Sequence, residues 1–294
     1  MSVVIPTYNH RNFIRSTLDS VFAQTFEDYE VIVVDDGSPD DTAEVLAPLA
    51  DAGRIRLIRQ ANAGQAAARN RGIDEARGTY IALLDDDDLW PADKLAVQVN
   101  AFEPEDVLVY GDVRRFRDDG LPETDPPRTY PTGDVLEAFL RENYIVSPGQ
   151  TLIRRDALRR VGGFDRHVWG SDDWDLYLRL ARLGPVCYVP HVALRYRLHE
   201  GNASRHAARH AANHMKVALR HIGLRPGLLL ASQRSAAGYF VPNLVNAAHA
   251  ARRRGDYAKA AAALLWTLPF RPSLLLRSGH GKRLAKDLVR AATG

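Results

Sequence analysis

The feature of this chain that most clearly suggests chemistry is the run Asp85-Asp86-Asp87-Asp88, which directly follows the apolar segment 79–84. Four adjacent carboxylates repel one another. A divalent cation is the simplest way to neutralise them, because Mg²⁺ and Mn²⁺ prefer hard oxygen ligands. In an extended segment alternate side chains point the same way, so Asp85 and Asp87 are expected to share one ion. We favour this metal site over the alternative, a solvated acidic turn that caps the next helix.

Two other acidic clusters and one histidine are weaker candidates. Asp36, which precedes Gly37 after another apolar segment, could accept a hydrogen bond from a nucleobase or a ribose hydroxyl, although Asp-Gly is also a good turn dipeptide. Asp172 and Asp173 open a predicted helix. Their spacing alone favours helix capping over a general base that removes a hydroxyl proton. His199, taken alone, is favoured as a surface histidine over a metal or phosphate ligand.

Several other kinds of site are excluded because the chain lacks their motifs. The chain has no glycine-rich phosphate loop, no zinc-protease or serine-hydrolase motif, and no paired cysteines. A phosphate group would therefore have to be held by a metal ion and by arginines.

Strand and helix patterns alternate in the first third of the chain. Strands are predicted at 2–6, 30–34, 56–59 and 79–84, and helices at 12–24, 42–50 and 64–77. This order predicts an α/β fold with a mostly parallel, Rossmann-like sheet and helices on both faces. Ligands of such sheets bind beyond the carboxyl ends of the strands, which is where Thr7, Asp36 and Asp85 fall.

The pattern is looser after residue 103 and changes again beyond His199. Strands are predicted at 107–110, 150–153, 186–190 and 193–197, helices at 133–143, 155–161 and 171–183, and a loop at 117–132. Beyond His199 we predict an α-helical appendage of three or four helices without a strand. One of its breaks is expected at Pro242, because proline interrupts helix hydrogen bonding.

Charge divides the chain into an acidic front and a basic tail. From Gly201 onward there are 16 Lys and Arg against 2 Asp, whereas residues 1–200 carry 23 basic and 34 acidic residues. The tail lacks interleaved aromatic residues, so nucleic acid is not expected as a partner. Two interpretations of the tail stay open. It could contact anionic lipid at the membrane surface, or it could form a solvated helical cap that also offers a homodimer surface. The candidates for lipid contact are Trp266, Leu268, Phe270, Leu274, Leu275 and Leu276 beside Arg271, Arg277, Lys282 and Arg283.

Cysteine content and hydropathy bear on the compartment. A single cysteine, Cys187, fits a reducing compartment. Neither a signal peptide nor an apolar stretch of roughly 20 residues is visible. We therefore expect a cytoplasmic protein, peripheral at the inner face of the membrane if the tail contacts lipid.

Five segments occur in an order and at spacings typical of one enzyme family. They are Val3-Val4-Ile5-Pro6-Thr7-Tyr8-Asn9, Ser20-Val21-Phe22-Ala23-Gln24-Thr25, Val31-Ile32-Val33-Val34-Asp35-Asp36-Gly37-Ser38, Asn62-Ala63-Gly64 with Ala68-Arg69-Asn70-Arg71-Gly72, and residues 78–91 followed by Lys94-Leu95. Together they resemble the family 2 glycosyltransferases, which adopt the GT-A fold. The resemblance covers about residues 2–200.

The resemblance implies a role for each candidate residue. Asp85-Asp86-Asp87 is similar to the family's D-x-D motif, with Asp87 as the first metal ligand. The base role carries over to Asp173, and Asp172 stands where the family more often has Glu. The implied sets are Pro6, Thr7, Tyr8, Asp36, Arg69, Asp85 and Asp86 for the donor, Asp172 and Trp174 for the acceptor, and Asp87, Asp85 and His199 for Mn²⁺ or Mg²⁺.

The activity implied by the resemblance is an inverting transfer of a sugar from a nucleotide-sugar donor, with a UDP-sugar favoured, to a hydroxyl of a glycan or lipid-linked acceptor in cell-surface polysaccharide synthesis. Residues 1–204 would form the catalytic domain, with its nucleotide-binding half at about 1–100 and its acceptor half at 101–204, and residues 205–294 the basic helical region. A nucleotidyltransferase on a related fold and a non-catalytic nucleotide-sugar-binding homologue stay open as alternatives.

Overall fold

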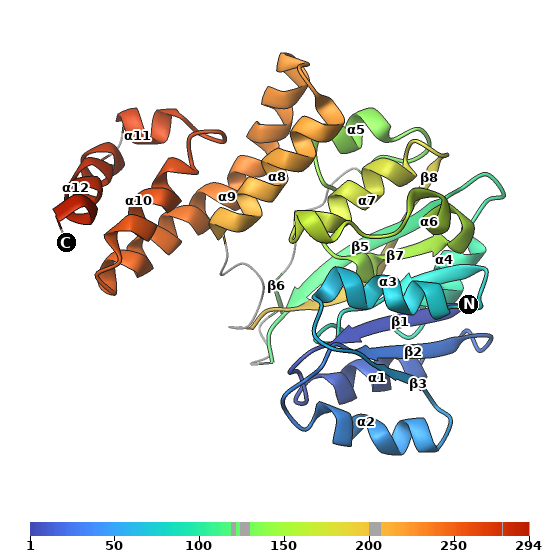
Figure 1. Cartoon of the computed structure of the whole chain (residues 1–294). Helices are drawn as coiled ribbons and strands as arrows, with labels where there is room; N and C mark the ends of the chain where they lie inside the picture. The colour runs from blue at the N-terminus through green and yellow to red at the C-terminus, as the bar shows by residue number, and fades with distance from the viewer. Residues whose placement is uncertain (119–121, 124–129, 200–206, 278, 294) are drawn as a thin grey trace. The chain divides into compact units, whose positions relative to one another are not determined.

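The computed structural model describes residues 1–118, 122–123, 130–199, 207–277 and 279–293, which fall into two compact units (Figure 1). The first unit comprises Met1–Glu137, Tyr144–His167 and Asp172–His199. The second comprises Ala138–Asn143, Val168–Ser171 and the described part of Glu200–Gly294. The boundary expected after residue 204 lies outside the described residues. The second unit also includes two short segments that precede the predicted helical region.

Four parallel strands form the N-terminal half of the sheet, in the order β3-β2-β1-β4. Their side chains alternate between two buried faces. Val3 and Ile5 of β1 pack in the core that also holds Leu18, whereas Val4 lies against Gly72. The helices therefore cover both faces, as predicted. The elements are β1 Ser2–Thr7, α1 Ile14–Phe22, β2 Glu30–Asp35, α2 Thr42–Asp51, β3 Arg56–Arg59, α3 Gln65–Glu75 and β4 Tyr80–Leu83.

The other half of the sheet is mixed. β7 (Thr151–Arg154) lies between β4 and β5 (Leu108–Phe116) and is antiparallel to both, while β8 (Val186–Arg197) pairs parallel with β5 and the short β6 (Pro122–Glu123) antiparallel with it. The remaining helices of this region are α4 Lys94–Asn100, α5 Leu136–Arg141, η1 Pro148–Gln150, α6 Arg155–Val161, η2 Arg166–Val168 and α7 Asp172–Leu180. The prediction of a mostly parallel sheet flanked by helices is confirmed.

One strand replaces the two that were predicted at 186–190 and 193–197. In the pairing of β5 with β8, Gly111 is opposite Val189 and Asp112 is opposite Val192, so Pro190 and His191 have no partner in the register. Proline cannot donate to a ladder and is tolerated at such a bulge. The prediction of two strands was wrong because the bulge carries one strand past Pro190.

The second unit is helical, and no strand occurs among its described residues. Its helices are α8 Ala207–Ile222, α9 Pro226–Arg253, α10 Tyr257–Leu265, α11 Ser273–Arg277 and α12 His280–Thr293. The prediction of a break at Pro242 was wrong, because Pro242 lies inside α9. Phe240, Val241 and Leu244 are buried in the core of this unit, and this packing offsets the hydrogen bond that proline cannot donate. Within the described residues, none of the helices is both long and apolar enough to cross a membrane.

Candidate active site

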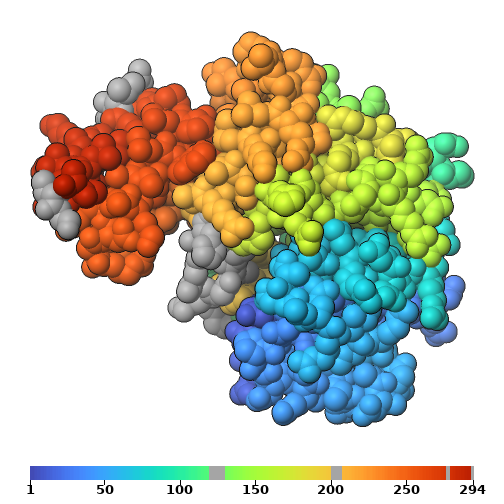
Figure 2. Space-filling model, in the orientation of Figure 1, coloured from blue at the N-terminus to red at the C-terminus, as the bar shows by residue number. Residues whose placement is uncertain are grey.

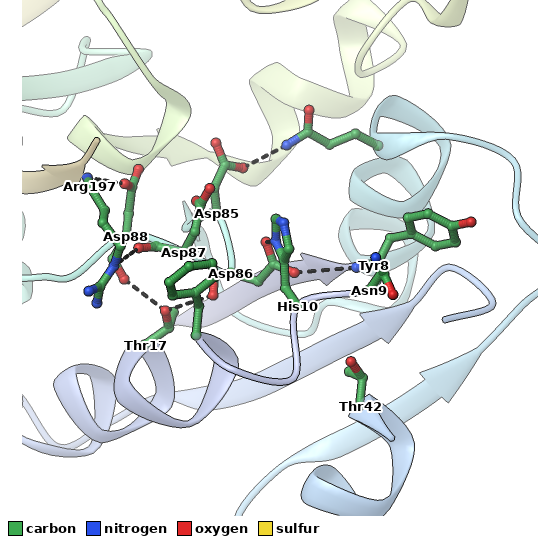
Figure 3. A network of polar contacts seen from close by, with 12 residues as sticks. Tyr8, Asn9, His10, Thr17, Thr42, Asp85, Asp86, Asp87, Asp88 and Arg197 are labelled. Carbon is green, nitrogen blue, oxygen red and sulfur yellow. Dashed lines mark hydrogen bonds and ion pairs between the residues drawn. The ribbon is translucent and has the colours of Figure 1, made fainter. Parts of the chain in front are cut away.

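The acidic run forms a turn directly after β4 (Figure 3). Asp86 and Asp87 occupy the turn, and the Asp88 N–H donates to the Asp85 carbonyl oxygen at 3.2 Å. The expectation of an extended run was therefore wrong, and with it the argument that Asp85 and Asp87 share a face. Each of the four carboxylates instead meets a different partner.

Asp86 turns toward the loop that follows β1. Its Oδ1 lies 2.8 Å from Nδ1 of His10, and its Oδ2 accepts a hydrogen bond from the Tyr8 N–H at 3.3 Å. The hydrogen bond with Asp86, opposed by burial, raises the pKa of His10 to about 8. Burial raises the pKa of Asp86, and this effect outweighs the opposite influence of His10. His10 is therefore mostly a cation at neutral pH, paired with Asp86.

Asp87 turns toward the end of β8. Its Oδ2 lies 2.9 Å from Nε2 of His199, and its backbone oxygen accepts from Nε of Arg197 at 2.7 Å. The structure thus brings together Asp87 and His199, two of the three predicted metal ligands.

A divalent cation fits the atoms at this turn. His10, Asp86 and Asp87 each offer one ligand atom, and these atoms all lie within 4.8 Å of one another. Carboxylate oxygens suit Mg²⁺ and Mn²⁺, and imidazole nitrogens also suit first-row transition metals. The cluster found in the described residues differs from the predicted set, because it contains His10 and Asp86 in place of Asp85 and His199. Which of these side chains bind metal stays a prediction.

Asp85 belongs to a buried network centred on Arg69 of α3. Nη2 of Arg69 lies 2.6 Å from Oδ1 of Asp85, and Nη1 lies 3.3 Å from Oδ2 of Asp172 at the start of α7. The Arg69 side chain is only 4% exposed. Gln65 Nε2 also donates to Asp85 Oδ1, at 3.1 Å. One guanidinium therefore links the acidic run to the Asp172-Asp173 pair, for which the resemblance implies the base role.

Asp173 is partly buried beside this network. Burial, followed by the charge of Asp172, raises the pKa of Asp173 to about 7, although Arg69 and a hydrogen bond from the Trp174 N–H act in the opposite direction. A carboxylate with a pKa near neutrality suits a general base. Trp174 itself is 1% exposed, so its side chain lies in the core. Its predicted contact with an acceptor stays untested.

Asp88 holds the turn in place. Its Oδ1 accepts from the Arg197 N–H at 2.8 Å, and Thr17 Oγ1 lies 2.9 Å from the backbone oxygens of both Asp86 and Asp88. Burial, followed by the charges of Asp87 and Asp85, raises the pKa of Asp88 well above its usual range.

The predicted nucleoside side chains differ in accessibility. Pro6 and Thr7 are buried, whereas Tyr8 is 46% exposed. Both oxygens of Asp36 already accept hydrogen bonds, at 2.7 Å from Gln60 Nε2, 2.9 Å from the Ala63 N–H and 2.8 Å from the Gly64 N–H. Asp36 thus anchors the loop before α3. Its predicted bond to a base would use lone pairs that these donors leave free.

His10 is the main residue of the site that sequence reasoning missed. It follows Asn9, whose φ of +58° is left-handed, a conformation that asparagine tolerates better than most residues. The Asn9 N–H donates to Ser38 Oγ at 3.0 Å. This sharp turn carries His10 toward Asp86 (Figure 3). The position of His10 just after the strand was the available signal.

The model of glycosyl transferase family 2 matches residues 2–162, and that of glycosyltransferase-like family 2 matches residues 128–256. An uncharacterized glycosyltransferase of Nostoc sp. is 31% identical over 218 residues, which cover 71% of this chain and 67% of the relative. An uncharacterized glycosyltransferase of Rickettsia felis is 28% identical over 70% of this chain. The match spans only 35% of that longer relative.

Solved structures show the same fold. S. aureus TarS 1–349 in complex with UDP-GlcNAc aligns with a TM-score of 0.67 at 15% identity, over 99% of this chain and 87% of that one. A mannosyltransferase from Pyrobaculum calidifontis, in complex with GDP-Man and Mn²⁺, aligns with a TM-score of 0.58 at 24% identity, over 99% and 85%. The GT-A fold is thereby confirmed. Because the family model spans more than half of the residues, the chain belongs to glycosyl transferase family 2.

Proposed function

We propose that this protein transfers a sugar from a nucleotide-sugar donor to an acceptor hydroxyl and inverts the anomeric carbon. The observation that carries the proposal is the Arg69 network, which joins Asp85 after β4 to Asp172 at the start of α7. Binding the donor and deprotonating the acceptor require separate acidic groups that lie close to each other. This network provides them in one buried cluster.

Asp173 is the proposed base. It takes the proton of the acceptor hydroxyl as the oxygen attacks the anomeric carbon, and the nucleotide leaves from the opposite face. A single displacement of this kind inverts the carbon and needs no covalent intermediate. Asp172, oriented by Arg69, would contact the acceptor. The side chain of Trp174 is buried, so the proposed role of this residue at the acceptor is limited to its position next to Asp173 in the chain.

The donor is proposed to lie over the ends of β1 and β4, with Tyr8 and Asp36 on the nucleoside side and Asp85 near the ribose. Mn²⁺ or Mg²⁺ would be held by Asp87 with Asp85 and His199, and His10 and Asp86 are further ligands that the geometry allows. When bound, such an ion supplies positive charge that stabilises a departing diphosphate. UDP is the proposed nucleotide, and the UDP-GlcNAc complex of TarS supports it.

The setting of the reaction is also a proposal. A glycan or lipid-linked acceptor, in cell-surface polysaccharide synthesis, fits a relative such as the chondroitin synthase of Pasteurella multocida, which is 30% identical over 69% of this chain and matches in 21% of its own length. We place the donor in about residues 1–100 and the acceptor in 101–204. The basic second unit is proposed to contact the inner face of the membrane from the cytoplasm, with a homodimer as the competing use.

The test begins with thermal shifts against a panel of nucleotide sugars, with and without Mn²⁺, followed by transfer assays and NMR of the product anomer. Asp173→Asn should bind the donor normally yet transfer at least about a hundredfold more slowly, the range for loss of a general base. Asp156→Asn, an exposed aspartate of α6, is the matched control and should behave as wild type. Robust transfer by Asp173→Asn would remove it as the base.

Two other outcomes would replace the proposed activity. Donor binding without turnover for any acceptor would indicate a non-catalytic binding protein. Release of pyrophosphate from a nucleoside triphosphate and a sugar phosphate would indicate a nucleotidyltransferase.

A further inference from the structure

The connection between α8 and α9 exposes leucines that nothing in the described residues covers. Leu224, in the connection, is 95% exposed and is the most exposed large apolar side chain of the described residues. Leu219 in the last turns of α8 is 49% exposed, and Leu230 near the start of α9 is 51% exposed. We call this end of the α8–α9 hairpin the leucine tip (Figure 2, orange). Water-exposed leucines in such a group mark an interaction surface.

The chain segment that forms the leucine tip carries charges of one sign. Residues 215–234 contain four Lys and Arg and no Asp or Glu. Arg225 lies in the connection itself, where Nε donates to the Ile222 carbonyl at 2.9 Å and Nη2 to the His221 carbonyl at 3.2 Å. It thereby caps α8 while remaining exposed. Apolar side chains flanked by cations are the composition of segments that lie at an anionic lipid surface.

A pocket on the next turns of α9 adds a second feature. It has a volume of about 330 Å³ and is lined by the exposed Arg234 and Arg271 over an apolar floor that includes Val241 and Phe270. Neither guanidinium has an ion-pair partner among the described residues. Leu230 and Arg234 are four residues apart on α9 and so share one face of that helix. The tip therefore continues into a site with two cations for a phosphate and a floor for hydrocarbon.

We propose that the leucine tip, with Arg234 and Arg271, is a docking surface for an anionic lipid bilayer. Leu224 and Leu230 enter the boundary between headgroups and acyl chains, and the two arginines bind lipid phosphate. This inference rests on the proposed membrane contact and not on the transfer reaction. It keeps Arg271 from the predicted region but assigns the insertion into lipid to the leucines of the tip, since Trp266 packs against the core of this unit and Phe270 is only 5% exposed.

The test is flotation of the full chain with vesicles of phosphatidylcholine alone or mixed equally with phosphatidylglycerol. Wild type should float with the anionic vesicles and lose binding at high salt. Leu224→Ser with Leu230→Ser should weaken binding at least about tenfold, because each removes a side chain that would be buried in lipid. Arg234→Ser with Arg271→Ser should weaken it further, by about fivefold for each arginine.

Matched controls lie on the same unit. Leu288→Ser removes a 47% exposed leucine from α12, and Arg253→Ser with Arg254→Ser removes two exposed cations from the far end of α9. These variants should bind vesicles nearly as wild type does. Thermal unfolding should be unchanged in every variant, because all of these side chains are exposed.

Each other outcome overturns part of the argument. Vesicle binding that tip variants leave unchanged would refute the tip while leaving membrane contact standing. Absence of vesicle binding in wild type would remove both, and the sugar transfer would be unaffected. A concentration-dependent dimer in sedimentation that Leu224→Ser abolishes, without lipid binding, would assign the tip to a second copy of the chain.

Discussion

Replacement of Arg69 by methionine is the sharpest perturbation that the structure offers. Arg69 faces Asp85 at 2.6 Å and Asp172 at 3.3 Å, and only 4% of its side chain is exposed. Methionine keeps much of the volume but removes the guanidinium that lies between these carboxylates. Breaking a buried pair by removal of one partner costs about 3–5 kcal/mol, since the other charge stays buried without compensation. We expect a fall of that size in the free energy of unfolding.

The same helix supplies the control. Arg71 pairs with Glu75 at 2.9 Å, but 53% of its side chain is exposed. Arg71→Met should therefore cost no more than about 1 kcal/mol. Urea unfolding followed by tryptophan fluorescence measures both variants. The double variant Arg69→Met with Asp85→Asn should recover part of the loss, because it removes one of the uncompensated charges. Equal destabilisation by Arg69→Met and Arg71→Met would refute the buried network.

Three further predictions follow from the site and its supports. The transfer rate of wild type should rise with pH through about 7, because Asp173 must be deprotonated to act as a base and burial raises its pKa to about 7; a flat profile from pH 5 to 8 would contradict this assignment. Asp87→Ala should abolish the effect of Mn²⁺ on nucleotide affinity in calorimetry, and an unchanged metal dependence would remove Asp87 as a ligand. Gly72→Ala should lower the free energy of unfolding by about 1–3 kcal/mol, because the added methyl group would lie 2.3 Å from Val4 Cγ1, and thermal denaturation that matches wild type would show that the helix can shift without cost.

The alternating strands and helices of the fold could be predicted from the sequence. β3 and α6 have the predicted bounds, and the other strands and helices from β1 to β4 differ from prediction by at most a few residues at either end. Hydrophobic period is a local property, so it can be seen in one sequence. Pro190 and Pro242 show where local reasoning fails. Each was expected to end an element, but a bulge in one case and core packing in the other carry the element past the proline.

The site was predictable at the level of its strand ends and less so at the level of contacts. Asp87 and His199 are predicted together as metal ligands, and Oδ2 of Asp87 lies 2.9 Å from Nε2 of His199. The pairing of Asp86 with His10 could not be predicted, because it depends on the left-handed turn at Asn9. The orientations of the four aspartates also depend on a turn. Turn geometry leaves a weaker mark on sequence than strand and helix periods do.

The alternation of partners along the acidic run has a consequence for the electric field at the mouth of the site. A naive count assigns it four negative charges, which would repel an anionic diphosphate. The largely protonated His10 offsets the charge of Asp86, but the two guanidinium groups are shared with other carboxylates, because Arg69 also pairs with Asp172 and Arg197 pairs with Asp118. Negative groups therefore remain in excess at this turn. Without a bound cation an anionic donor should be repelled, and its association rate should rise with ionic strength as salt screens that repulsion.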